Sequence, residues 1–128
     1  MRQHNQGFTL IELLVVVAII GIISAVSVVA YSGYKSSAEQ KQAEITLNTI
    51  YLAEQEYKSN NGEYYFNAST SNLVTNLFDG VDDLSEQSYT FKTTDVSSLT
   101  ITATKKTNTS CTISITEKNK KPNISSAC

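Results

Sequence analysis

Glu12 is the residue of this chain whose surroundings most demand a chemical explanation. It is the one charged side chain in an otherwise apolar run from Phe8 to Ala30. As a helix, this run extends roughly 34 Å, which is enough to cross a bilayer. A carboxylate inside such a segment is costly without a partner, so it marks function. If the chain were cut between Gly7 and Phe8, the new α-amine would be a cation one helical turn from such a carboxylate.

Cys111 and Cys128 are a second pair of residues that could do chemistry, by forming a cross-link. They show no CxxC spacing and have no histidine nearby, which fits a disulfide better than a metal site. Two free thiols in a reducing cytosol are the alternative. The roughly 70 residues after Ser59 are marginal for a core without a staple. A bridge would contribute about 3 kcal/mol.

Lysines form a basic cluster in the loop between the cysteines. Lys118, Lys120 and Lys121 lie there, and Lys105 and Lys106 lie in the preceding turn. Such a loop could bind DNA phosphates. The alternative is a solvated polar loop, which the absence of arginine and aromatic residues from the loop favours. Nucleic acid is therefore a possible partner but not the favoured one.

The residue types give little support for metal binding or for catalysis. Asp79, Asp82, Asp83 and Glu86 could offer oxygen ligands to calcium, but their spacing does not fit an EF-hand, and a solvated acidic loop is favoured. The sole histidine, His4, precedes the apolar run, and the chain has no glycine-rich phosphate loop. We expect no enzyme activity, no catalytic residue, no cofactor and no metal.

One long helix must carry Glu12. Residues 35–59 are rich in helix-forming side chains and contain neither glycine nor proline, so the sequence predicts a helix from Phe8 to about Asn60. Asn60-Asn61-Gly62 is a plausible stop. The second half carries an apolar stripe that Glu54 interrupts, with Ile45 and Leu52 at its flanks. The stripe comprises Ala43, Leu47, Ile50 and Tyr57.

Short strands are expected to carry Cys111, with Cys128 at the end of a loop that follows them. Residues 61–87 read as an irregular connecting region with one helical turn at Ser71–Phe78. Period-two alternation then predicts three strands, at Tyr89–Lys92, Leu99–Thr104 and Cys111–Thr116, followed by a polar loop at Glu117–Cys128. The predicted fold is α+β: a long N-terminal spine helix packed on an antiparallel sheet of three to four strands.

The segment Gly7-Phe8-Thr9-Leu10-Ile11-Glu12, the polar leader before it and the apolar run after it resemble a type IV prepilin. The resemblance implies cleavage after Gly7 by an inner-membrane prepilin peptidase, N-methylation of Phe8 and assembly of the apolar helices into a filament core. It also implies that Glu12 pairs with the Phe8 amine of a neighbouring subunit; a pair within one subunit is the alternative. Arg2 would keep the leader cytoplasmic.

The resemblance also implies a domain plan and a life cycle. Residues 1–7 would be the leader, 8–30 the membrane or filament-core helix half, and 31–128 the head. Within the head, 31–60 would be helix, 61–87 the connecting region, and 88–128 the β-meander and disulfide loop. The family usually has proline where Val29 stands, which would loosen the helix there. The later part of the chain is similar to small minor pilins of type IVa systems. The similarity lies in Glu54-Gln55-Glu56-Tyr57, Asn60, Asn61 and Tyr64, and in an ending of the order strand, Cys, strand, loop, Cys.

Several functions remain open on this basis. The favoured one is a pilus subunit that resides in the inner membrane as a prepilin and then in an extracellular filament serving adhesion, twitching motility or DNA uptake. Its partners would be other pilins, prepilin peptidase and the assembly platform. The alternatives are a type II secretion pseudopilin, whose family usually uses calcium in place of a disulfide, and a minor pilin that acts as a DNA-uptake receptor. An unprocessed single-pass membrane protein lies outside these.

Overall fold

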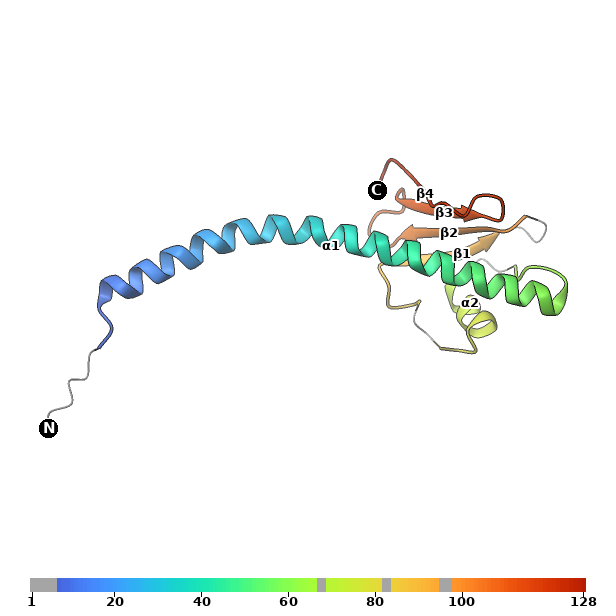
Figure 1. Cartoon of the computed structure of the whole chain (residues 1–128), viewed down its shortest axis with the longest axis horizontal. Helices are drawn as coiled ribbons and strands as arrows, with labels where there is room; N and C mark the ends of the chain where they lie inside the picture. Colours follow the sequence, from blue (N-terminus) through green and yellow to red (C-terminus); the bar gives the residue numbers. More distant parts are fainter. Residues whose placement is uncertain (1–6, 67–68, 82–83, 95–97) are drawn as a thin grey trace, which may run out of the picture. The chain divides into compact units, whose positions relative to one another are not determined.

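The computed structural model describes residues 7–66, 69–81, 84–94 and 98–128. Their elements occur in the order α1 (Leu10–Asn61), α2 (Thr70–Leu77), β1 (Tyr89–Thr94), β2 (Thr100–Lys105), β3 (Thr112–Thr116) and β4 (Asn123–Ile124) (Figure 1). The chain divides into two compact units, with the boundary between Ser37 and Ala38. From this point on, the word head refers to the second unit, residues 38–128, and not to the predicted range 31–128. The fold is α+β, as predicted, with a long helix packed on a four-stranded antiparallel sheet.

Helix α1 is continuous over its 52 residues, which confirms the predicted single long helix. Its end lies close to the predicted stop. Gly62 adopts a φ of 87°, which favours glycine, and its N–H donates to the Lys58 carbonyl oxygen at 2.8 Å. The Asn61 side chain donates to the Tyr57 carbonyl oxygen at 2.9 Å, so the last turn is held by both backbone and side-chain bonds.

The part of α1 in the head buries one face. Ala43, Leu47 and Ile50 are buried, and they form one core with the inward side chains of the sheet. Tyr57 was expected to continue this stripe but is only half-buried, and its ring lies against that of Tyr65. The interrupting residue, Glu54, is fully buried.

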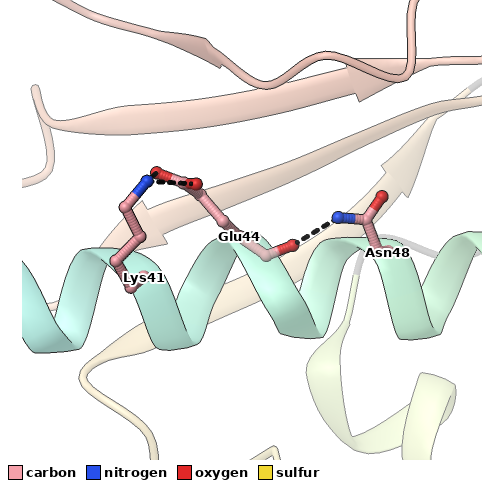
Figure 2. A network of polar contacts seen from close by, with 3 residues as sticks. All are labelled: Lys41, Glu44 and Asn48. Carbon is pink, nitrogen blue, oxygen red and sulfur yellow. Dashed lines mark hydrogen bonds and ion pairs between the residues drawn. The ribbon is translucent and has the colours of Figure 1, made fainter.

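Polar contacts link successive turns of α1 in the head around Glu44, whose side chain is 15% exposed. Lys41 Nζ lies 2.8 Å from Glu44 Oε2, and the Asn48 side chain donates to the Glu44 carbonyl oxygen at 3.0 Å (Figure 2). Pairs three and four residues apart are neighbours on a helix surface and support it by a few tenths of a kcal/mol each, roughly. The exposed face of α1 in the head mixes such polar side chains with the apolar Ile45 and Leu52.

The sheet has the strand order β1-β2-β3-β4, and each neighbouring pair is antiparallel. Burial alternates along the three longer strands, so one face supplies the core. That face carries Tyr89, Phe91 and Thr93 from β1, Ile101 and Ala103 from β2, and Ile113 and Ile115 from β3. The predicted meander is confirmed.

Strand boundaries differ from the predicted ones by a residue or two. Leu99 and Cys111 were expected to begin strands, but they precede β2 and β3, although their carbonyl oxygens still accept bonds from Glu117 and Lys105. The C-terminal stretch predicted as a polar loop contains the short strand β4, where Ile124 pairs with Ile113. Two residues are too few to show alternation in the sequence.

The connecting region contains a helix of two turns where one turn was expected. α2 spans Thr70–Leu77, and the Ser69 side chain caps it by accepting from the Asn72 N–H at 3.4 Å. Its first residue also covers the outer edge of β1. Thr70 Oγ1 accepts from the Phe91 N–H at 2.9 Å and donates to the Phe91 carbonyl oxygen at 3.0 Å, as a neighbouring strand would.

A disulfide joins Cys111 and Cys128, with 4.5 Å between their Cα atoms. Cys111 is buried and Cys128 is exposed. Ser125 adds to this attachment, because its N–H donates to the Thr112 carbonyl oxygen at 2.9 Å and its hydroxyl accepts from the Thr112 N–H at 3.0 Å. The end of the chain is therefore fastened to the start of β3 by one covalent bond and two hydrogen bonds.

Candidate functional site

The start of α1 places Glu12 in a capping box with Thr9. Glu12 Oε2 accepts from the Thr9 N–H and from the Thr9 hydroxyl, both at 2.8 Å, and the Glu12 N–H donates to the Thr9 hydroxyl at 3.3 Å. In this reciprocal arrangement, each residue satisfies a donor that the first helical turn leaves unpaired. Sequence reasoning did not identify Thr9, although the Thr-x-x-Glu spacing before an apolar run is the known signal for this box.

Gly7 and Phe8 lie just before the helix, and the Phe8 side chain is 87% exposed. In the uncut chain the Phe8 nitrogen is an amide and carries no charge. Among the described residues, all side-chain hydrogen bonds of Glu12 end on Oε2. The second carboxylate oxygen can therefore accept from a cation without disturbing the cap.

The first half of α1 exposes its apolar side chains. Every described side chain from Phe8 to Val28 is exposed, including Leu13, Val17 and Ile22 at 58–69%. Among the described residues, α1 is the one helix long and apolar enough to cross a membrane. A contiguous apolar surface of this size is a feature of sites that contact lipid or other proteins.

The lysines of the disulfide loop, Lys118, Lys120 and Lys121, are all exposed. Lys120 Nζ lies 5.1 Å from the centre of the Tyr51 ring, within reach of a cation–π contact. The two lysines of the preceding turn make other contacts. Lys105 pairs with Glu39 at 3.6 Å, and Lys106 donates to the Ser85 carbonyl oxygen at 2.6 Å.

A network of side chains joins the end of α1 to the loop after β3. The Tyr64 hydroxyl donates to Glu117 Oε1 at 2.8 Å and accepts from the Gln55 side chain at 2.9 Å. Lys58 Nζ lies 3.4 Å from Glu117 Oε1 and 4.1 Å from the centre of the Tyr64 ring. The Tyr64 hydroxyl and Lys58 lower the pKa of Glu117, because both stabilise its ionised form.

The acidic stretch that begins at Asp79 lies partly outside the described residues. Asp79 has a φ of 50°, in the left-handed region, within the turn after α2, whereas Asp82 and Asp83 lie outside the described residues. Among the described residues, no three of His, Cys, Asp and Glu lie together in a way that could hold a metal ion.

Comparison with known proteins gives one match. Residues 2–28 match the family model described as the prokaryotic N-terminal methylation motif. No curated protein and no solved structure gave a match. The motif supports a type IV prepilin-like protein. The motif indicates a pilin-like or pseudopilin substrate of prepilin peptidase.

Proposed function

We propose that this protein is a structural subunit of a type IV pilus, matured by cleavage between Gly7 and Phe8 and by N-methylation of Phe8. The observation that carries the proposal is the exposed apolar half of α1 within the methylation-motif match. A lone chain in water could not keep this surface uncovered. The inner membrane would cover it first, and the helices of neighbouring subunits would cover it in the filament.

We propose that Glu12 sets the axial register of each subunit as it joins the filament. After cleavage, the Phe8 nitrogen becomes a cation, and the free oxygen of Glu12 would pair with such a cation on a neighbouring subunit. In apolar surroundings a charged pair is strongly favoured over either charge alone. The capping box with Thr9 supports this role, because it fixes the carboxylate at the start of the helix.

Intact mass and N-terminal sequencing of the protein from sheared surface filaments would test this proposal. We expect a chain that begins at methylated Phe8 and is two hydrogen atoms lighter before reduction than after it. A chain in filaments that still begins at Met1 would overturn the processing proposal. A processed chain confined to the envelope would favour the pseudopilin, although the Cys111–Cys128 staple argues for a pilus subunit.

A Glu12→Gln variant tests the registering role. We expect it to be cleaved normally but lost from filaments, with Glu56→Gln as the control because Glu56 is an exposed carboxylate on the same helix. Normal incorporation of Glu12→Gln would contradict the role.

A DNA-uptake receptor is the second candidate, favoured by the three exposed lysines of the disulfide loop. Replacing Lys118, Lys120 and Lys121 by alanine should then weaken DNA binding while filaments still assemble. If DNA binding is the same in the variant, the loop serves only as a solvated surface.

A further inference from the structure

Glu54 is a buried carboxyl group with a hydrogen bond to one of its two oxygens. Its exposed fraction is 0%. Oε2 accepts from the Tyr65 N–H at 2.8 Å, whereas Oε1 has no hydrogen-bond partner among the described residues. Burying an ionised carboxylate with one partner costs far more than burying the neutral acid. Burial therefore favours the protonated form of Glu54 over the ionised form.

Tyr65, the partner of Glu54, connects three elements of the head. Its carbonyl oxygen accepts from the Thr93 hydroxyl on β1 at 3.1 Å. Its hydroxyl accepts from the Asn76 side chain on α2 at 2.9 Å, and its ring centre lies 5.4 Å from that of Tyr57 on α1. Whatever holds the Tyr65 backbone against α1 therefore also helps to hold α2 and the edge of the sheet.

Few charges are available to stabilise an ionised Glu54. Apart from Glu54, the titratable residues within four positions of it on α1, in residues 63–65 and on β1 are Tyr51, Glu56, Tyr57, Lys58, Glu63, Tyr64, Tyr65, Tyr89 and Lys92. Lys58 is committed to Tyr64 and Glu117, and Lys92 is exposed. No residue of α2 titrates. Burial raises the pKa of Glu54 to about 7, opposed only by the Tyr65 N–H.

We propose that Glu54 is a proton-operated latch, which holds Tyr65 against α1 while its carboxyl is neutral and releases Tyr65 when the proton leaves to solvent. The ionised form makes a stronger bond to the Tyr65 N–H, but that gain is smaller than the cost of keeping the charge away from water. Moving residues 62–66 away from α1 is the direct way to hydrate the carboxylate. The head would thus hold α2 firmly below neutral pH and loosely above it.

The latch has a wild-type test on the full chain in detergent micelles. The carboxyl ¹³C resonance of Glu54, assigned by its absence in Glu54→Gln, should titrate near neutrality, and the Tyr65 amide resonance should shift with it. The exposed Glu56 serves as the internal reference. Titration of Glu54 at the pH of an ordinary glutamate would overturn the proposal.

Amide exchange tests whether protonation controls opening. Between pH 5.5 and 8.5, and after correction for intrinsic exchange, protection of the Tyr65 amide should fall about tenfold to thirtyfold in the wild type. It should stay constant in Glu54→Gln, which is neutral at every pH, and fall as in the wild type in Glu56→Gln. Equal behaviour of the wild type and Glu54→Gln would refute the latch. These outcomes do not depend on whether the chain enters filaments.

Discussion

The two halves of helix α1 are both helical, but they differ in what covers their apolar side chains. In the head, the helix buries Ala43, Leu47 and Ile50 in a core made by its own chain. Before Val28, every described side chain is exposed although most are apolar. Helix formation alone therefore does not define a stable segment. The second half is completed by tertiary packing, whereas the first needs a covering that this chain does not supply.

Removing residues 1–37 is the most drastic way to test that difference. We expect residues 38–128 to be soluble without detergent and to keep the helix and sheet content of the head, because the core lies wholly within them. The full chain should need detergent. Solubility, sedimentation and circular dichroism would measure both. A head that aggregates or unfolds would show that the first half contributes to folding of the second.

A pair of leucines on α1 tests which face of the helix stabilises the head. Leu47 is 0% exposed and Leu52 is 67% exposed. Leu47→Ala should lower the free energy of unfolding by about 2–5 kcal/mol, since it removes buried methyl groups and leaves a cavity. Leu52→Ala should change it by less than about 0.5 kcal/mol. Denaturant unfolding in micelles would measure both, and equal losses would contradict the burial of one helix face and the exposure of the other.

Loss of the disulfide should have the next largest effect on the head. Changing both cysteines to alanine should cost about 3 kcal/mol, mainly because the unfolded chain gains freedom. The first half of α1 should stay helical. Denaturant unfolding with and without reductant gives the matched measurement, since reductant should weaken the wild type and leave the double variant unchanged. A variant as stable as the oxidised wild type would show that the hydrogen bonds of Ser125 suffice.

The smallest expected effect is the dependence of stability on pH at Glu54. A raised pKa in the folded state means that folded protein binds more protons than unfolded protein between about pH 4.5 and 7, so stability from this group falls as pH rises through that window. Between pH 5 and pH 8, the stability of Glu54→Gln relative to the wild type should increase by about 2–3 kcal/mol. A difference that stays constant with pH would contradict a raised pKa for this carboxyl.

The sequence predicted the features that repeat along the chain. Helical spacing revealed α1, and alternation revealed β1, β2 and β3. The features it did not predict depend on single tertiary contacts. Burial of Glu54 requires the Tyr65 N–H, which comes from beyond the helix end, and β4 consists of two residues that pair with β3. The capping box at Thr9 had a readable signal, which the larger motif around it obscured.

The hydroxyl of Thr70 affects how the heads of neighbouring molecules can contact one another. By occupying the N–H and carbonyl oxygen of Phe91, it blocks part of the free rim of β1, while the opposite rim ends in the two residues of β4. Neither rim offers a long open ladder to a strand from another molecule. Heads that are held close together should therefore not pair edge to edge into one continuous β-sheet. Contacts between them should stay reversible.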